Sequence, residues 1–236
     1  TGEATNDVSV LTPAIEAEIQ KAIDRRKLDF YVPYPKQLAF HAATAESGIK
    51  QILLMAGNQL GKTLSAGAQT AIWSTGQYPT WWNGRRFNGP TNFWVGSPTG
   101  QTMREGPQRI LLGEIGEWGS GMIPGRNIID IRKAVHGSSD QVESILVRHD
   151  PTGKISRLLL KTYDQGRIRW QGATINGVWY DEEPPEDIYD EGKTRTIVKN
   201  GLVYLTFTPL LGMTEVVTRY LKEQVPGSRV IRMGIV

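Results

Sequence analysis

Residues 51–63, QILLMAGNQLGKT, decide the fold of this chain. Residues 51–56 form a short, mostly apolar run, which is typical of a strand that is buried on both faces. The rest follows the GxxxxGK[ST] spacing of a phosphate-binding Walker A loop, with Ala56 in place of the first glycine. Small residues let backbone N–H groups wrap a phosphate, and a helix over residues 62–75 would point its positive end at the anion. The segment predicts a strand–loop–helix unit that binds a nucleotide.

The loop also predicts the chemistry of the site. Lys62 would reach the β- and γ-phosphates and act in catalysis, and the hydroxyl of Thr63 would ligate Mg²⁺. A chance match is the alternative, but the flanking strand and helix are the context that the motif requires. ATP and Mg²⁺ are the expected cofactors, and the expected ATP-binding residues of the loop are Ala56, Gly57, Asn58, Gln59, Leu60, Gly61, Lys62 and Thr63.

A second apolar stretch, VWYDE at residues 178–182, ends in two acids. Asp181 would hold Mg²⁺ at the end of a strand, and Glu182 would activate the water that attacks the γ-phosphate. An acidic first turn of a helix is the alternative, and it suits Glu186 and Asp187 better. A catalytic glutamate beside a metal-binding aspartate indicates hydrolysis rather than transfer of phosphate to a second substrate.

Residues 202–208, LVYLTFT, predict a third buried strand. Thr206 and Thr208 alternate along it and therefore share a face. In a parallel sheet this strand could lie next to residues 51–56 and place a threonine near the γ-phosphate. Plain packing within the sheet is the other interpretation, because threonine is common in strands.

The remaining pattern alternates helices and strands, which implies an α/β sheet with helices on both faces. Further helices are expected from Pro13 to the basic run at residues 25–27, over residues 38–46 and 102–115, between residues 180 and 202, and after Gly212. Further strands are expected at residues 92–96, 128–132, 144–149, 157–163 and 177–180.

Composition excludes several classes of protein. The chain has no cysteine, so it has neither a disulfide framework nor a thiolate metal site. No run of 18 apolar residues is present, and no membrane association is expected. His41, His136 and His149 lack the spacing of zinc ligands.

The net charge of +3 conceals an uneven distribution. Residues 181–191 hold seven acids and no base, which leaves 17 acids against the chain's 27 bases elsewhere. A basic body of this kind favours a polyanionic partner. Residues 81–87, WWNGRRF, interleave aromatic and basic side chains and could grip DNA, but packing of a loop is the simpler interpretation.

Taken together, the motifs resemble the motor ATPase domain of the large terminase subunits of tailed phages. The resemblance rests on YPKQ at residues 34–37, AGNQLGKT at 56–63, QG and then VWYDEEPP within 171–185, and LTFTP at 205–209. The Walker motifs are shared by many NTPases. The order is the specific part, with the glutamine motif upstream and the Thr-Pro motif downstream.

The resemblance implies a P-loop NTPase fold of the additional-strand catalytic-glutamate, RecA-like type. It also implies that ATP hydrolysis drives double-stranded DNA into a prohead. It assigns Gln37 to adenine recognition, and Thr206 with Thr208 to a motif that couples hydrolysis to DNA movement. The implied partners are double-stranded DNA, the portal protein, the small terminase subunit and further copies in a ring, in the cytoplasm of the host cell.

The expected organisation is a single ATPase domain over residues 1–236. Residues 1–50 would form a helical lid with the adenine-binding segment, and residues 51–236 the P-loop core. Because the chain stops at Val236, soon after the coupling motif, no nuclease domain is expected in these residues.

Two positions depart from the family pattern, because Asn58 and Gln171 stand where many relatives carry an arginine. Such an arginine finger stabilises transition-state charge and is supplied in cis or by a neighbouring subunit. Each arginine that could serve as the finger could also be a basic side chain that faces solvent or DNA. The candidates are Arg104, Arg109, Arg167 and Arg169.

Two other functions stay open at the level of the sequence. One is a helicase or recombination-type translocase with the same core, although no second RecA-like half is visible. The other is a non-hydrolysing nucleotide-binding assembly subunit, which would bind nucleotide and release no phosphate.

Overall fold

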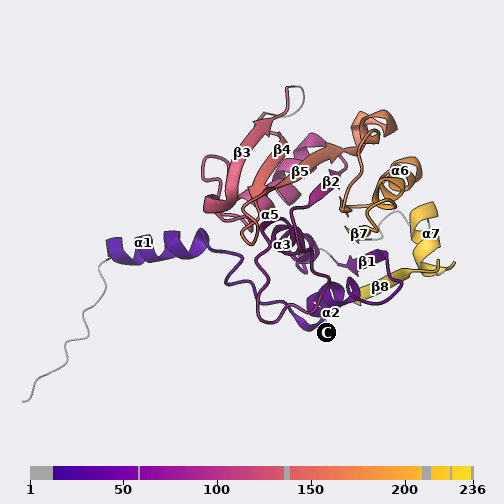
Figure 1. Ribbon diagram of the computed structural model, residues 1–236, viewed down its shortest axis with the longest axis horizontal. Coiled ribbons are helices and arrows are strands. Elements are labelled where there is room, and N and C mark those ends of the chain that lie inside the picture. Colours follow the sequence, from indigo (N-terminus) through magenta and orange to yellow (C-terminus); the bar gives the residue numbers. More distant parts are fainter. Residues whose placement is uncertain (1–12, 58, 136–138, 209–213, 224, 235–236) are drawn as a thin grey trace, which may run out of the picture.

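The computed structural model describes residues 13–57, 59–135, 139–208, 214–223 and 225–234. Eight strands within these residues form one sheet in the order β3-β4-β5-β2-β6-β7-β1-β8 (Figure 1). The strands are β1 (Gln51–Ala56), β2 (Asn92–Ser97), β3 (Ile128–Lys133), β4 (Val142–Arg148), β5 (Ile155–Thr162), β6 (Gly177–Asp181), β7 (Leu202–Phe207) and β8 (Ser228–Met233). All neighbours from β5 to β8 are parallel, whereas β4 runs antiparallel to both β5 and β3.

Helices cover both faces of this mixed sheet. The α-helices are α1 (Pro13–Asp24), α2 (Pro35–Ala43), α3 (Lys62–Thr75), α4 (Gly100–Met103), α5 (Arg109–Leu112), α6 (Glu186–Thr196) and α7 (Glu215–Leu221). Four short elements complete the described set: the π-helix η1 (Arg104–Gln108) and the 3₁₀ turns η2 (Gly125–Asn127), η3 (Tyr163–Gln165) and η4 (Arg167–Trp170).

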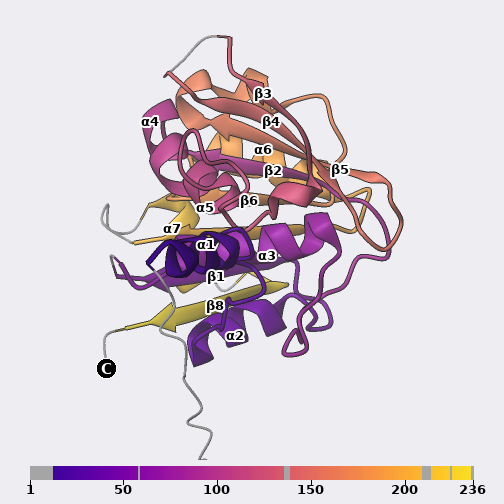
Figure 2. The ribbon, with the colours of Figure 1, turned by 90° about the vertical axis from the view of Figure 1, so that its left-hand side faces the viewer.

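Two apolar clusters lie on opposite faces of the sheet. One joins the buried side chains of α2, α3 and α5 to the strands, and Figure 2 shows α3 and α5 in front of the sheet. The other joins α6, α7 and η4 to the far face, through side chains such as Tyr189, Val217 and Trp170. Every residue of β6 and β7 is buried. The continuous apolar runs of the sequence therefore become the centre of the sheet.

The order of the strands confirms the position expected for residues 202–208. Strand β7 pairs in parallel with β1 on one side and with β6 on the other. Thr206 lies level with Leu54 of β1 and with Asp181 of β6. The carboxyl ends of the three strands that carry the predicted motifs consequently meet at one edge of the sheet.

Three expected helices differ from the prediction. Helix α2 begins at Pro35 rather than Leu38, because Pro35 suits a first helical turn and Gln37 closes a capping box at Tyr34. The helix expected over residues 102–115 passes through the π-helix η1, which contains Pro107, and ends at Leu112 before Gly113 at φ 97°. The predicted apolar face of α1 is not buried, since Ile15 and Ile19 are each 45% exposed.

The C-terminal region adds a strand that the sequence pattern did not predict. Residues 228–233 form β8, which pairs with the full length of β1 and ends the sheet. Among the described residues, no helix is long and apolar enough to span a membrane.

Candidate active site

The phosphate-binding loop connects the carboxyl end of β1 to α3. Gly61 precedes the helix with φ 80°, a left-handed conformation that favours glycine, and Gln59 also has a positive φ of 61°. Helix α3 then begins at Lys62, as the sequence predicts. Asn58, the remaining member of the predicted loop, lies outside the described residues. A glycine in this conformation directly before a helix is a feature on which phosphate-binding loops depend.

Lys62 and Glu182 face each other across the site. The Nζ atom of Lys62 lies 3.4 Å from Oε1 of Glu182, and the lysine side chain is buried whereas the glutamate is 40% exposed. Glu182 has φ 63°, a conformation that a residue other than glycine rarely adopts. Its N–H donates to the carbonyl of Thr206 at 2.9 Å, and its carbonyl accepts from the hydroxyl of Tyr163 at 2.9 Å. These backbone contacts hold the glutamate in the turn after β6.

Asp181 is buried and accepts two hydroxyl hydrogen bonds at the same oxygen. Thr63 Oγ1 lies 2.9 Å and Thr206 Oγ1 lies 2.8 Å from Oδ1 of Asp181. Burial raises the pKa of this carboxyl group to about 7, while the two hydroxyl hydrogen bonds and the charge of Lys62 oppose the rise. On the other oxygen, a Cβ atom at Gly106 of η1 would come within 3.3 Å of Oδ2, so a glycine there leaves this oxygen room.

The donor set fits a magnesium ion. A threonine hydroxyl and a carboxylate oxygen are hard ligands, and Mg²⁺ in phosphate-binding sites commonly takes one or two of these from the protein. No group of three or more His, Cys, Asp or Glu residues that could hold a metal occurs in the part of the chain that the structure describes. Phosphate oxygens and water would therefore complete the coordination.

The two threonines of β7 and its end have different partners. Thr206 is fully buried; its hydroxyl donates to Asp181 and accepts from the indole N–H of Trp179 at 2.7 Å. Thr208 donates to the carbonyl of Ala56 at 2.9 Å. One threonine thus contacts the Walker B strand and the other contacts the end of the Walker A strand. Pro209, which follows in the predicted motif, lies outside the described residues.

Gln37 lies beside the phosphate loop and is only 1% exposed. Its Oε1 accepts from the backbone N–H of Tyr34 at 2.8 Å, and its Nε2 donates to the carbonyl of Gly61 at 3.2 Å. The family resemblance predicts that Gln37 recognises adenine. The structure places Gln37 beside the phosphate loop, and both ends of its amide form hydrogen bonds within the chain.

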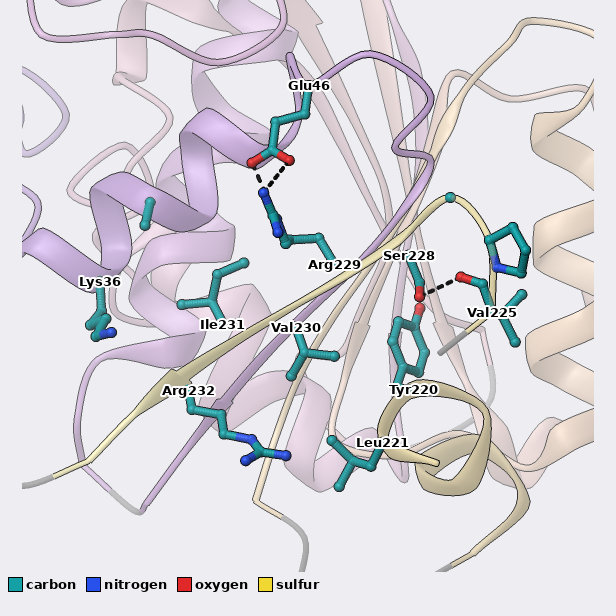
Figure 3. A pocket seen from close by; sticks show the side chains of 13 residues that line it. Lys36, Glu46, Tyr220, Leu221, Val225, Ser228, Arg229, Val230, Ile231 and Arg232 are labelled. Carbon is teal, nitrogen blue, oxygen red and sulfur yellow. Dashed lines mark hydrogen bonds and ion pairs between the residues drawn. The ribbon is translucent and has the colours of Figure 1, made fainter. Parts of the chain in front are cut away.

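A separate hollow of about 760 Å³ lies along β8, between α2 and α7 (Figure 3). Its rim includes Lys36, an ion pair between Glu46 and Arg229 at 2.6 Å, and Arg232. None of the predicted site residues lines it. The converging polar groups at the ends of β1, β6 and β7 mark the candidate active site more strongly than this hollow does.

With this geometry established, comparisons with known proteins give the family. Residues 53–235 match the family described as terminase large subunit, T4likevirus-type, N-terminal. The chain belongs to this terminase family. It is 41% identical over 224 residues to the terminase large subunit of Salmonella phage P22, covering 87% of this chain and 44% of that protein. The chain therefore spans less than half the length of this relative.

Solved structures of other terminases share the fold. The large terminase ATPase domain of Thermus phage P74-26 aligns with a TM-score of 0.57 at 18% identity, covering 87% of this chain and 82% of that chain. The large terminase of another bacteriophage, described as thermophilic, aligns with a TM-score of 0.58 at 15% identity, covering 86% of this chain and 46% of that chain. The RecA-like α/β fold expected for a terminase domain is confirmed.

Three of the four arginine-finger candidates in this terminase chain are paired within it. Arg104 donates to the carbonyl of Ser139 at 3.1 Å, Arg109 pairs with Glu114, and Arg167 Nε lies 2.9 Å from Glu191. Arg169 is exposed, and its guanidinium makes no hydrogen bond or ion pair with a described residue. The pairing separates Arg169 from the other candidates.

The acidic segment of this terminase chain serves structural roles beyond Asp181 and Glu182. Glu183 accepts from the hydroxyl of Thr214, Glu186 and Asp190 pair with Arg219, and buried Glu191 pairs with Arg167 and Arg195. The hydrogen bond from Arg195 is the main cause that lowers the pKa of Glu191. Three arginines therefore neutralise much of the cluster, and two of them, Arg219 and Arg167, join α6 to α7 and to η4.

The WWNGRRF segment packs as a loop against the core. The indole groups of Trp73 and Trp82 both donate to the carbonyl of Arg85, at 2.8 and 3.1 Å, and the Arg85 side chain donates to the carbonyl of Asn200 at 2.7 Å. Trp82 is buried. These contacts agree with packing rather than with a grip on DNA.

Sequence reasoning missed two contributors to the site, Tyr163 and Gly106. Tyr163 donates to the carbonyls of both Asp181 and Glu182, and Gly106 approaches Asp181 from the π-helix. A proline within a helical pattern was the one available signal for the irregular helix. No local sequence pattern marks Tyr163, because the turn that its hydroxyl contacts is distant from it in the sequence.

Proposed function

We propose that this chain is the ATP-hydrolysing motor domain of a terminase large subunit that moves double-stranded DNA into a prohead. One observation carries the proposal: Lys62, Thr63, Asp181 and Glu182 converge although the hydrogen-bonded pair Thr63 and Asp181 lies 118 residues apart in sequence. Membership of the terminase family supports it. One similar solved structure is described as an ATPase domain, and the large terminase of the thermophilic bacteriophage was solved in complex with ADP.

The proposed reaction uses groups that already lie in place. The amide groups of residues 57–63 and the ammonium group of Lys62 bind the phosphates, so Lys62 exchanges its ion pair with Glu182 for the β- and γ-phosphates. Glu182 is then free to accept a proton from water, whose oxygen attacks the γ-phosphorus while the bond to the β-phosphate oxygen breaks. Mg²⁺, held by Thr63 and Asp181, would neutralise charge on the phosphates.

Thr206 and Thr208 are proposed to couple hydrolysis to movement. Thr206 bonds Asp181 directly and Thr208 bonds the end of β1, so a shift of either strand during the reaction alters β7. We also propose that residues 1–236 act as one ATPase domain, in which residues 1–50 form a helical lid with the adenine-binding segment and residues 51–236 form the core.

Arg169 is the proposed arginine finger, supplied to a neighbouring copy in a ring. It is the exposed candidate whose guanidinium has no partner among the described residues. A mixing experiment tests this. Arg169→Ala chains and Glu182→Gln chains should each be inactive, and a mixture should regain phosphate release, because some sites then combine an intact Glu182 with an intact Arg169. A mixture that stays inactive would contradict a finger supplied in trans.

The DNA is proposed to contact the open face of β5. A hollow of about 620 Å³ there has Arg132, Arg157 and Lys161 in its lining, with Glu143 as the acid on its rim; Arg169 also lines it but is assigned to the neighbouring copy. Phosphate contacts suit a motor that tracks any sequence. Arg157→Ala should lower the slope of DNA affinity against salt by about one unit, and an unchanged slope would place the DNA elsewhere. The family relationship supports the portal protein and the small terminase subunit as partners, and the host cytoplasm as the location.

Phosphate release at increasing protein concentration, with and without double-stranded DNA, tests the proposed function. A DNA motor should release phosphate faster as it assembles and with DNA present, and Glu182→Gln should abolish release while ATP still binds. Binding without release under all of these conditions would favour the non-hydrolysing assembly subunit. Separation of DNA strands by the protein would favour the helicase.

A further inference from the structure

The 3₁₀ turn η4 carries the exposed Arg169 between two residues that are attached to the rest of the domain. Arg167 Nε lies 2.9 Å from Oε2 of Glu191 on α6. Trp170 is fully buried and packs edge to face on Trp94 of β2, with ring centroids 5.8 Å apart. The turn therefore presents the side chain of Arg169 to solvent from a backbone that is held on both sides.

Strand β2 leaves the space that the indole of Trp170 fills. A Cβ atom at Gly96 would lie 2.6 Å from the ring of Trp170, so a side chain at this position would displace the indole. The indole N–H donates to the carbonyl of Thr162 at the end of β5, at 3.4 Å. The residue that follows Arg169 is thus packed directly on the sheet.

Lys161 of β5, which lies level with Gly96, makes a further contact with η4. Its Nζ donates to the carbonyl of Arg169 at 2.5 Å, and it lies 4.7 Å and 5.9 Å from the ring centroids of Trp94 and Trp170. An ammonium group is attracted to the face of an aromatic ring. One side chain therefore joins the sheet, the indole of Trp170 and the backbone of Arg169.

Lys161 and Arg169 also interact through their charges. Burial is the main cause that lowers the pKa of Lys161; Glu143 opposes the decrease, and the charge of Arg169 adds to it. Two positive charges repel each other. Lys161 consequently attracts the carbonyl of Arg169 and repels its guanidinium group, which favours a guanidinium that faces solvent rather than the sheet.

We propose that Lys161 is a positioning residue for Arg169, which holds the backbone of η4 so that the guanidinium can reach the γ-phosphate bound by a neighbouring copy. This inference rests on the proposed role of Arg169 as a finger supplied in trans. Lys161 lies on β5, which β2 separates from β6, whereas the catalytic groups of the same copy lie at the ends of β1, β6 and β7. Loss of Lys161 should therefore impair the site of the neighbour and spare that of its own copy.

The first measurement is phosphate release by assembled Lys161→Met protein without DNA, so that no contact with DNA contributes. Methionine fills a similar volume but has no ammonium group. Release should fall roughly tenfold or more, the usual effect of losing a hydrogen bond from a charged donor, while ATP affinity stays at the wild-type value. An unchanged rate of release, or a loss of ATP affinity, would overturn the role of Lys161.

Lys133→Met is the matched control. Lys133 lies on β3, where its Nζ is 5.5 Å from the ring centroid of Trp118 and bonds Asp140 at 2.6 Å. The variant removes a comparable contact between an ammonium group and an indole, remote from η4, and should release phosphate like the wild type. A loss equal to that of Lys161→Met would show that the effect is not specific to Arg169.

Mixtures of variants show which copy is impaired. Lys161→Met chains mixed with Glu182→Gln chains should release more phosphate than either alone, because some sites then combine an intact Glu182 with a positioned Arg169. Lys161→Met mixed with Arg169→Ala should give no gain, since neither chain supplies a positioned finger. The reverse pattern, or any other, would overturn the role of Lys161. If the reference mixture of Arg169→Ala and Glu182→Gln gained nothing, the proposed finger in trans would be wrong, and this inference with it.

Hydrogen exchange separates positioning from a general loss of structure. In Lys161→Met, exchange should increase in residues 166–171 and stay at the wild-type rate in β1, β6 and β7. Faster exchange throughout the sheet would show that Lys161 supports the fold as a whole, and wild-type exchange in residues 166–171 would show that it does not hold η4. Either result would overturn the proposal.

Discussion

The two sides of the phosphate loop are built from similar polar side chains but differ in burial and in partners. On the α2 side, Gln37 and His41 are buried and bonded by their own chain. On the β6 side, Glu182 is 40% exposed, and its side chain meets Lys62 in an ion pair at 3.4 Å. Gln37 and His41 on the first side are hydrogen-bonded within the chain, whereas the second side has a contact that a ligand can replace.

The difference indicates that the α2 side holds the phosphate loop in place, while the β6 side carries the groups that are proposed to react. Breaking a buried hydrogen bond costs the desolvation of the group left behind, so the α2 side resists change. A partly exposed ion pair contributes little net stability, so a phosphate group can displace it easily. The loop is therefore fixed on the α2 side, whereas the ion pair between Lys62 and Glu182 on the β6 side can be exchanged for a ligand. The following variants test each half of this comparison.

The largest effect is expected on the β6 side. Glu182→Gln should lower ATP turnover by roughly 10²–10⁴-fold, the usual contribution of a general base, because glutamine cannot accept the proton from water. ATP affinity should be retained or rise, since Lys62 no longer has to leave an ion pair. Steady-state phosphate release and equilibrium ATP binding are the measurements.

The matched control for this variant is the adjacent acid. Glu183 accepts from the hydroxyl of Thr214 and does not contact Lys62 in the structure. Glu183→Gln should keep most of the turnover. If both variants lost turnover equally, the assignment of the base to Glu182 would be wrong.

The next effect concerns stability where β7 joins Asp181. Thr206→Val should reduce the free energy of unfolding by up to about 3 kcal/mol, because it leaves the indole N–H of Trp179 buried without an acceptor. Urea denaturation measures the change. Thr208→Val removes a half-buried hydrogen bond to Ala56 and should cost about 1 kcal/mol or less. Equal losses would show that burial of Thr206 is not what matters.

The contribution of the α2 side to stability should decrease at acidic pH. The pKa of His41 is lowered by burial to about 4 in the folded protein, from about 6.5 when unfolded, so the unfolded state binds more protons in this window. The contribution of His41 to stability is therefore lost as the pH falls from 6.5 toward 4, by about 2 kcal/mol between pH 7 and pH 5, whereas the raised pKa of Asp181 acts in the opposite direction. Denaturation at both pH values is the measurement. His41→Gln should remove this share of the pH dependence, and an unchanged dependence would contradict the burial effect.

The smallest effect is expected at the backbone of Asp181 and Glu182, on the β6 side of the loop. Tyr163→Phe removes the hydroxyl that donates to the carbonyls of Asp181 and Glu182, and it should cost about 1 kcal/mol of stability. Turnover should fall several-fold, because Glu182 keeps its unusual φ less firmly. Tyr78→Phe removes a hydroxyl that bonds Phe87, remote from the acids, and is the control. It should lower stability similarly and leave turnover per folded molecule unchanged.

Much of the site could be predicted because each motif is local. The run from Gln51 to Thr63 defines its strand, loop and helix, and the run from Val178 to Glu182 defines a strand that ends in acids. The position of β7 beside β1 also followed, since parallel strands bring their carboxyl ends to one edge. What was predicted correctly depends on contiguous residues and on the rules of sheet topology.

The remainder depends on pairings between distant side chains, which no window of sequence contains. The partner of Arg167 is Glu191, 24 residues away, and the partner of the Gln37 amide is the carbonyl of Gly61. The family resemblance singled out Gln37, but only the structure shows that it lies beside the phosphate loop and which way its amide faces. Strand β8 escaped prediction because SRVIRM neither alternates between apolar and polar residues nor forms a continuous apolar run, as expected of a strand at the edge of the sheet.

The order of the strands also decides when β1 can pair during synthesis. Its two neighbours are β7 and β8, and β7 begins at Leu202, 146 residues after β1 ends at Ala56. At translation rates of 5–20 residues per second, the wait is roughly 7–30 s. During it, Ile52, Leu53 and Leu54, which are fully buried in the finished sheet, have only the adjacent helices to cover them, and the backbone edges stay open. The strand that carries the phosphate loop is thus the segment of the nascent chain most exposed to aggregation.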